Sequence, residues 1–255
     1  MQRVTILALT LALAQSATSY GFGQSMAAPA STGPVYTVMP DSSLVALLPP
    51  PPMRTSATAH EELKLLHDLE KNSTPAQKAA ALADSKESDI FVYRTVLGNN
   101  FSARALPLTA ALSTQVRRDS EYWNGVLKNI YRRPRPYRDD TTLHPLCGAD
   151  QAYSYPSGSA MAGYLEAMLL AEIVPEQREA IFVRADDFAH NRWVCGAHYP
   201  SDTNMAHQIA ATLFGIMLAN PAFEEKLATA RAETRHQLGL PELPPNLHWR
   251  VQKVE

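Results

Sequence analysis

Residues 156–174 read PSGSAMAGYLEAMLLAEIV. This stretch carries two charged residues, Glu166 and Glu172, so a helix over residues 157–174 would be apolar on most of its surface. A helix that is hydrophobic nearly all round lies in the interior of a protein rather than at its surface. The stretch therefore predicts a helix that is buried on most sides, within a larger helical assembly.

Helical periodicity continues on both sides of this stretch, and no credible strand pattern interrupts it. Further helices are expected over about residues 58–71, 74–84, 89–97, 106–131, 175–191, 202–219 and 221–239. The eleven glycines are few for a turn-rich β protein of 255 residues. We therefore expect an all-α fold, a single-domain helical bundle of about seven to eight helices.

The part of the chain before the bundle has a different composition. Residues 15–55 are small, polar and proline-bearing, and the run LLPPPP occupies residues 47–52. Four consecutive prolines exclude a helix and favour an extended polyproline conformation. The sequence predicts an extended proline-rich arm over residues 20–55, either draped on the domain or loose in solvent. A helical domain over residues 56–240 and an irregular tail over residues 241–255 follow it.

The first nineteen residues are typical of an export signal. Arg3 supplies a positive charge, residues 4–14 form an apolar run, and small residues follow. Such a run is too short to span a bilayer as a helix, so we expect residues 1–19 to be a cleaved signal peptide. The mature protein would then be periplasmic or secreted. The alternative is a segment that tethers the protein to a membrane.

Composition argues against several classes of protein. Hydrophobic residues make up 45% of the chain and charged residues 19%, which is typical of a globular domain rather than a disordered chain. The net charge of −2 indicates no basic surface, so we expect no nucleic-acid partner. Beyond the signal, no stretch of about 20 apolar residues is present, so we expect no integral membrane span. The sequence leaves open whether the protein forms a homo-oligomer.

Export would place the two cysteines, Cys147 and Cys195, in an oxidising compartment, where they permit one internal pairing. A disulfide between them would tie the loop before Ser157 to the loop that carries His198. Two buried free thiols are the alternative.

Two segments supply groups that bind an anion. Lys128 and Arg135 lie seven residues apart across a predicted helix end. Lys128 offers a compact ammonium charge, and Arg135 offers a planar guanidinium that can bind two oxygens. Ser157 and Gly158 precede the apolar helix, so the Ser157 hydroxyl can cap it and the first-turn N–H groups can bind an anion. Taken singly, each feature has a plainer explanation, because most basic residues are solvated and many helices open with Ser-Gly for capping alone.

A third segment supplies a nucleophile. Arg192, His198 and Asp202 stand where two predicted helices are linked, with the carboxylate four residues after the imidazole. A neutral histidine attacks phosphorus through one ring nitrogen, and a carboxylate on the other nitrogen fixes the tautomer. Asp202 is also expected to be the N-cap of its helix, and a lone histidine is more often structural than nucleophilic. The three segments together nevertheless predict phosphoryl transfer.

In order and spacing, the three segments resemble the signature of the type 2 phosphatidic acid phosphatase and vanadium haloperoxidase superfamily. The chain is most similar to the secreted bacterial class A non-specific acid phosphatases. The pattern of that family is Lys-x6-Arg-Pro, Pro-Ser-Gly-His and Ser-Arg-x5-His-x3-Asp. Here it stands as Lys128-x6-Arg135-Pro136, Pro156-Ser157-Gly158-Ser159 and Asn191-Arg192-x5-His198-x3-Asp202. The resemblance runs from the proline-rich arm to the end of the last helix near residue 239.

The resemblance implies metal-independent hydrolysis of a small phosphate monoester through a phosphohistidine, with inorganic phosphate as product. It implies neither a cofactor nor a metal site. In that mechanism His198 is the nucleophile and Asp202 orients it. The groups that hold the phosphate oxygens are Lys128, Arg135, Ser157, Gly158 and Arg192.

Two positions depart from the family pattern. Asn191 replaces a serine and keeps a polar side chain. Ser159 replaces the histidine that protonates the leaving group, and a serine hydroxyl cannot act as an acid at mildly acidic pH. General acid catalysis contributes about 10²–10⁴-fold, so we expect activity that is attenuated or selective for good leaving groups. Water, His144 or His190 is an alternative source of the proton.

Three other functions remain open from the sequence. A catalytically silent protein that binds phosphate or a phosphoester would keep the same anion-binding groups. A membrane-lipid phosphatase is disfavoured by the absence of a long apolar span. A haloperoxidase is possible because the same cradle of the superfamily holds vanadate.

Overall fold

A computed structural model describes residues 33–87 and 89–243 of the chain. The predicted signal peptide, the first part of the predicted arm (residues 20–32) and the end of the predicted tail (residues 244–255) lie outside the described residues.

The described part of the chain is built from α-helices and short 3₁₀ turns, and it contains no β-strand. Seven helices have ten or more residues: α2 (Ala57–Asn72), α3 (Pro75–Asp84), α5 (Pro107–Tyr131), α7 (Gly158–Ile173), α8 (Arg178–Val194), α9 (Pro200–Leu218) and α10 (Pro221–Gln237). The shorter elements are α1 (Asp41–Val45), η1 (Ile90–Tyr93), α4 (Arg94–Leu97), α6 (Pro136–Asp139) and η2 (Pro175–Gln177). The prediction of an all-α bundle is confirmed.

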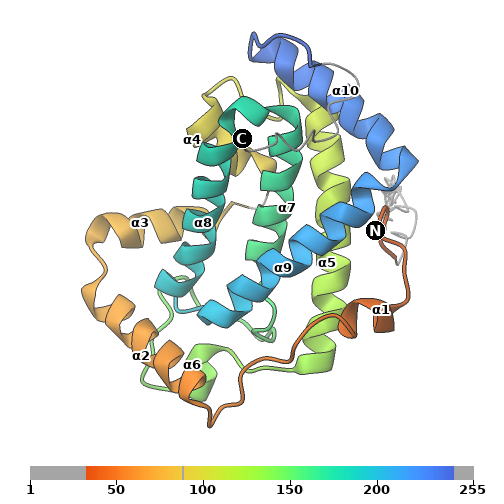
Figure 1. The fold of residues 1–255 in the computed structure, drawn as a ribbon. Helices are drawn as coiled ribbons and strands as arrows, with labels where there is room; N and C mark the ends of the chain where they lie inside the picture. Colours follow the sequence, from red (N-terminus) through yellow and green to blue (C-terminus); the bar gives the residue numbers. More distant parts are fainter. Residues whose placement is uncertain (1–32, 88, 244–255) are drawn as a thin grey trace, which may run out of the picture. The chain divides into compact units, whose positions relative to one another are not determined.

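Helix α7 is surrounded by other helices, as its sequence predicts. It contacts α5, α8, α9 and α10, and Figure 1 shows it between α5 and α8 with α9 alongside. Leu165, Leu169 and Leu170 of α7 have no exposed surface. Each leucine buried in this way stabilises the fold by roughly 1.5–3 kcal/mol relative to an exposed one. Contact on several sides explains why this helix has no continuous polar face.

Prolines and capping residues set where the helices begin. Helix α3 begins at Pro75, behind a capping box in which the Thr74 hydroxyl accepts a hydrogen bond from the N–H of Gln77 at 3.2 Å. The Gln77 side chain accepts one from the N–H of Thr74 at 2.8 Å. Helix α5 ends where Arg132 adopts a left-handed conformation with φ of 48°, two residues before Pro134.

The described part of the arm, residues 33–55, is docked on the bundle. The carboxylate of Asp119 on α5 accepts hydrogen bonds from the backbone N–H groups of Tyr36 and Thr37, both at 2.8 Å. The prediction that the arm is extended throughout is wrong for the five residues of α1. This short helix forms because Pro40 sets the turn before it and because Leu44 is fully buried against the bundle.

Two tyrosines bind the proline run that follows α1. The Tyr155 hydroxyl donates to the carbonyl of Pro49 at 2.8 Å, and the Tyr131 hydroxyl donates to the carbonyl of Leu48 at 3.3 Å. Tyr131 is the last residue of α5, and Tyr155 precedes the Pro-Ser-Gly turn. The arm therefore contacts both segments that are predicted to bind phosphate. None of the described helices combines the length and apolar character needed to cross a membrane.

Candidate active site

His198 and Asp202 lie at the junction of α8 and α9. Helix α9 begins at Pro200, a residue that is favoured at the first helical position because it has no N–H to leave unpaired. Asp202 is therefore the third residue of the helix, and the prediction that it is the N-cap is wrong. Its carboxylate reaches back to accept a hydrogen bond from the N–H of Tyr199, the actual N-cap, at 2.9 Å.

Four groups converge on the buried carboxylate of Asp202. Nδ1 of His198 lies 3.3 Å from Oδ2, which also accepts hydrogen bonds from the Ser154 hydroxyl and the Tyr199 N–H. Nη1 of Arg133 donates to Oδ1 at 2.7 Å. Burial raises the pKa of Asp202, but the hydrogen bond from His198 and the charge of Arg133 outweigh burial, so the net shift is downward. Asp202 is therefore an anion held in the interior by its partners.

Arg133 is a structural part of this site that sequence reasoning missed. Its side chain is 6% exposed, and Nη2 donates to Oε2 of Glu62 at 2.9 Å. Its guanidinium carbon lies 3.7 Å from the centre of the Tyr199 ring. The position of Arg133 between Lys128 and Arg135 was the one available signal. Nothing in the sequence connects it with Glu62, 71 residues earlier.

The tautomer of His198 follows from its two neighbours. Nη1 of Arg135 lies 2.6 Å from Nε2 of His198. A guanidinium only donates hydrogen bonds, so Nε2 is the acceptor and the ring proton sits on Nδ1, facing Asp202. Burial, followed by the positive charge of Arg135, lowers the pKa of His198 to about 3 in spite of Asp202. His198 is therefore neutral at mildly acidic and neutral pH, with a lone pair on Nε2.

Arg135 is oriented by groups on both sides. Nη1 donates to the carbonyl of Ala197 at 2.8 Å, and Nε donates to the carbonyl of Ala152 at 3.2 Å. Nη2 forms an ion pair with the exposed carboxylate of Asp150 at 2.8 Å. These contacts aim the guanidinium at His198. Asp150 was not predicted to belong to the site.

Lys128 lies in the last turn of α5 and points its charge toward the same cluster. Burial lowers its pKa to about 8, and the charge of Arg135 adds to that effect while Asp150 and Asp202 oppose it. Within the described residues, the Lys128 amine has neither a hydrogen bond nor an ion pair. A half-buried cation in this state has the capacity to bind an anionic ligand.

The Pro-Ser-Gly turn opens α7, as predicted. The Ser157 hydroxyl accepts a hydrogen bond from the N–H of Ala160 at 3.4 Å, and Ser157 is fully buried, whereas Ser159 is exposed. A Cβ atom on Gly158 would lie 2.6 Å from Nδ2 of Asn124, so the Asn124 amide is packed directly against this glycine. Asn124 was not predicted, and its buried Oδ1 has no hydrogen-bond partner among the described residues.

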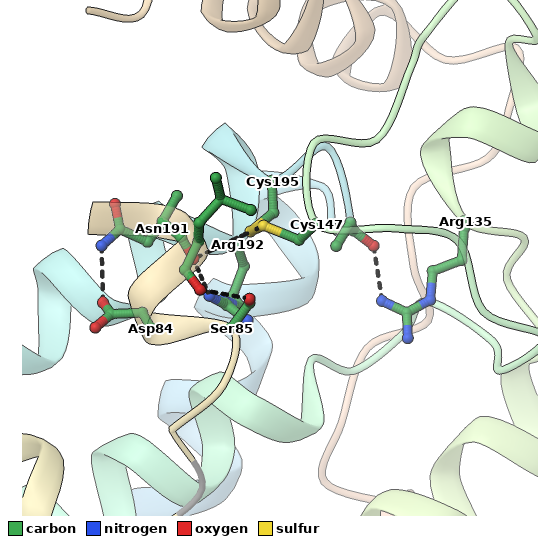
Figure 2. Close-up of a disulfide and its surroundings, with 10 residues drawn as sticks. Asp84, Ser85, Arg135, Cys147, Asn191, Arg192 and Cys195 are labelled. Carbon is green, nitrogen blue, oxygen red and sulfur yellow. Dashed lines mark hydrogen bonds between the residues drawn. A yellow bond between two sulfur atoms is a disulfide. The ribbon is translucent and has the colours of Figure 1, made fainter. Parts of the chain in front are cut away.

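Arg192 lies beside the cluster rather than in it. Nη2 donates to the carbonyl of Ala81 at 3.4 Å, and the buried Nε has no partner among the described residues. The disulfide between Cys147 and Cys195 adjoins the same place, with Cys195 Sγ 3.6 Å from that carbonyl oxygen. Figure 2 shows the disulfide next to Arg192, with Arg135 on the far side of Cys147. The neighbouring Asn191 donates to Asp84 at 2.7 Å.

Five of the predicted residues line one cavity. Its volume of about 340 Å³ is within the usual range for small-molecule sites. The five are Lys128, Arg135, Gly158, Ser159 and His198. The other three predicted site residues, Ser157, Asp202 and Arg192, are not among the residues lining the cavity.

The two histidines considered as proton donors are not among the lining residues either. His144 is largely exposed, with Nδ1 3.1 Å from the carboxylate of Glu70. His190 packs edge-on against the ring of Trp193, with the ring centres 5.0 Å apart. The described residues contain no group of three His, Cys, Asp or Glu side chains placed to hold a metal ion.

The chain is similar in sequence to known proteins. Residues 105–224 match the sequence profile of the PAP2 superfamily, a range that includes every residue described above as lining the cavity. An acid phosphatase of Zymomonas mobilis is 28% identical over 218 residues, covering 82% of this chain and 82% of that protein. A non-specific acid phosphatase of Salmonella typhimurium is 29% identical over 206 residues, covering 73% and 78%.

Two further matches are more distant. A non-specific acid phosphatase of Providencia stuartii is 26% identical over 206 residues, covering 74% of this chain and 79% of that protein. A crystal structure of a transmembrane PAP2 type phosphatidylglycerolphosphate phosphatase from Bacillus subtilis is 19% identical and covers 75% and 98%. Its TM-score of 0.37 is too low to carry an argument about this fold. The chain thus contains a PAP2 superfamily domain, and its relatives in sequence are acid phosphatases.

Proposed function

We propose that this protein is an exported acid phosphatase that hydrolyses small phosphate monoesters through a phosphohistidine on His198. The PAP2 domain and the acid phosphatase relatives support phosphatase function. The observation that carries the finer proposal is the neutral imidazole of His198, held between Asp202 and Arg135 at the wall of a cavity. An activated nucleophile with an orienting carboxylate and adjacent cations is the arrangement that phosphoryl transfer needs.

The phosphate group binds at the junction of Lys128, Arg135 and the start of α7. First-turn N–H groups at Gly158 and Ser159 donate to its oxygens, with the helix dipole favouring the negative charge. Arg135 leaves Nε2 of His198 and takes a phosphate oxygen, which frees the lone pair. Arg192 completes the site by turning its unpartnered Nε toward the same group.

Two displacements then follow. Nε2 of His198 forms a bond to phosphorus while the bond from phosphorus to the ester oxygen breaks. The ester oxygen leaves with the electron pair as an alkoxide or phenolate and takes its proton from solvent water. Asp202 stabilises the positive charge that develops on the ring. A water molecule next attacks phosphorus, the bond to Nε2 breaks, and inorganic phosphate and neutral His198 are restored.

Ser159 stands where the resemblance places a proton donor, and its hydroxyl cannot supply one. Its position on the cavity wall leaves the departing oxygen without a protein acid at this point. We therefore expect the enzyme to favour esters whose alcohol leaves as a stabilised anion.

Lys128, Arg135 and Arg192 neutralise the phosphate charge in this mechanism, so it requires no metal ion. Hydrolysis should survive a chelator, and vanadate should inhibit it because vanadate adopts the five-coordinate geometry of the transition state. The test is a hydrolysis assay over phosphate monoesters of graded leaving-group acidity, with and without EDTA. Strict dependence on an added divalent ion would contradict the proposal.

Export is the remaining part of the proposal. The signal-like first nineteen residues and the disulfide between Cys147 and Cys195 both fit an oxidising compartment. Fractionation of cells that express the full chain tests this, with the mature protein expected outside the cytoplasm and shorter by its signal.

Ser159 also supports a second candidate, a silent protein that binds phosphate without turnover. The same assay separates the two candidates when it is combined with calorimetry of inorganic phosphate binding. Binding without hydrolysis of any ester would favour the silent protein.

A further inference from the structure

The cavity extends well beyond the phosphate-binding end. It is lined on α7 by Ser159, Ala162, Gly163 and Glu166, which follow the i, i+3, i+4, i+7 spacing of one helix face. At 1.5 Å per residue, Ser159 and Glu166 are roughly 10 Å apart along the helix. On α5, the lining residues Lys128, Asn124, Ser120 and Arg117 follow the same direction. The cavity is therefore a groove between α5 and α7, with the phosphate site at one end and Glu166 at the other.

Glu166 is a hydrogen-bonding group set into the far end of this groove. Its side chain is 2% exposed, and Oε1 accepts a hydrogen bond from the Ser113 hydroxyl at 2.9 Å. Burial raises the pKa of Glu166 to about 8, although Ser113 and Arg117 oppose the shift. Glu166 is thus a neutral carboxylic acid at mildly acidic pH, with an O–H donor and acceptor oxygens.

The charged groups around Glu166 already have partners. Nη2 of Arg117 lies 3.2 Å from the carboxylate of Glu121, and Arg94 pairs with Glu87. The Asp89 carboxylate accepts a hydrogen bond from the N–H of Phe91 at 2.9 Å. A second anionic group on the substrate would therefore lie near a carboxylate, and each arginine that could bind it is already paired with a glutamate. An uncharged polar group meets no such cost.

The middle of the groove is lined by small and apolar residues. Ala162 and Gly163 are the residues on the α7 side between the two ends, and their side chains are small. The Phe188 ring of α8 also lines the groove and packs against Gly163, so this part of the groove offers an aromatic surface on which a flat ring can pack. The two para oxygen atoms of such a ring are about 5.5 Å apart, and a hydrogen bond of about 2.8 Å beyond one of them extends the span to about 8 Å, which is comparable with the roughly 10 Å between Ser159 and Glu166.

We propose that this groove binds the alcohol part of the substrate, and that Glu166 selects a phenol that carries an uncharged hydrogen-bonding group opposite the ester oxygen. This inference rests on the proposed phosphatase function and deepens it. The two ends of the groove set separate requirements. Because Ser159 cannot donate a proton, the leaving oxygen must depart as a stabilised anion, as the oxygen of a phenol does. Glu166 binds the group at the other end of the ring.

The test compares 4-hydroxyphenyl phosphate with 4-methylphenyl phosphate. The two phenols are nearly equal in acidity and size, so a difference in kcat/KM reports recognition rather than leaving-group chemistry. We expect the hydroxyl compound to be favoured about three- to tenfold, the effect of one hydrogen bond. In Glu166→Leu the preference should disappear or reverse, and in Glu166→Gln it should be partly kept.

Two controls keep this test separate from the proposed function. The inhibition constant for inorganic phosphate should be the same in all Glu166 variants, because phosphate occupies the other end of the groove. Binding of 4-hydroxybenzylphosphonate and 4-methylbenzylphosphonate, measured by calorimetry, tests the same preference without turnover. Equal binding and equal kcat/KM in the wild-type protein would overturn the inference while leaving phosphatase function intact. Absence of hydrolysis with a retained preference in binding would instead contradict the proposed function alone.

Discussion

Nη1 of Arg135 lies 2.6 Å from Nε2 of His198, the nitrogen that we expect to attack phosphorus. The lone pair of the expected nucleophile is therefore engaged by one of the groups that should bind the substrate. In the proposed mechanism, substrate binding would also release the nucleophile, because the guanidinium would exchange an imidazole nitrogen for a phosphate oxygen.

Replacement of this arginine should change the titration of the histidine. The charge of Arg135 is the second cause, after burial, that lowers the pKa of His198 to about 3. We expect Arg135→Gln to raise that pKa and to weaken inhibition by inorganic phosphate. Titration of the His198 ring protons by NMR measures the first effect. An unchanged histidine titration would contradict the contact.

Removal of the nucleophile should abolish turnover. We expect His198→Ala to lose hydrolysis of aryl phosphates and to yield no phosphoenzyme after acid quench, whereas the wild-type protein is labelled on His198. His190→Ala is a matched control, because His190 is not among the residues that line the cavity. Full activity of His198→Ala with an unchanged melting temperature would remove the mechanism.

His198 should also make the protein sensitive to acid. Its pKa in the folded protein, about 3, is below the value near 6.5 of an unfolded chain, so the unfolded state binds more protons between these limits. The contribution of His198 to stability is therefore full above pH 6.5 and declines as pH falls toward 3. Between pH 6.5 and 5 the loss is about 2 kcal/mol. In urea titrations, His198→Gln should lose less stability over this interval than the wild-type protein.

The histidine missing at position 159 should be recoverable. We expect Ser159→His to raise kcat/KM for alkyl phosphates, whose alkoxide needs a proton, by about 10²-fold or more. Aryl phosphates should change little, since their phenolate leaves unaided. Ser159→Ala is the control and should resemble the wild-type protein on both classes. A flat dependence on leaving-group acidity in the wild-type protein would mean that another group donates the proton.

Loss of the disulfide should destabilise the protein and disturb the site. Cys147 and Cys195 close a loop with a sequence separation of 48, which contributes about 4 kcal/mol in the chain-entropy model. Cys147→Ser with Cys195→Ser should lower the free energy of unfolding by a similar amount and weaken phosphate binding, because Arg192 adjoins the bridge. Mass spectrometry of the exported wild-type protein should show this bridge. Alkylation of both cysteines without reduction would refute it.

The fold was largely predictable because its signals are local. The two charges in residues 157–174 indicated a buried helix, and α7 is packed on several sides. Thr74 and Pro75 marked the start of α3. Helix α1 was missed because five residues carry no periodic pattern, and its stability comes from burial of Leu44 against distant parts of the chain.

Only the candidate site residues that belong to a sequence motif were predictable. Lys128, Arg135 and His198 come together at one cavity as their motifs predict. Asn124 and Glu166 carry no signature, because their roles arise from the packing of α5 against α7. The capping role of Asp202 was misjudged because Pro200 moved the start of α9 two residues earlier.

The two oxygen atoms of the Asp202 carboxylate bind the Tyr199 N–H at the start of a helix, the His198 ring, the buried Arg133 and the Ser154 hydroxyl. A residue with so many partners has little freedom to change during evolution, since a substitution harms folding and chemistry together. Lys128, whose amine has no such partner among the described residues, is under no comparable constraint from the fold. In a lineage released from selection for catalysis, Lys128 should therefore be lost early, while Asp202 persists as a remnant of a function no longer performed.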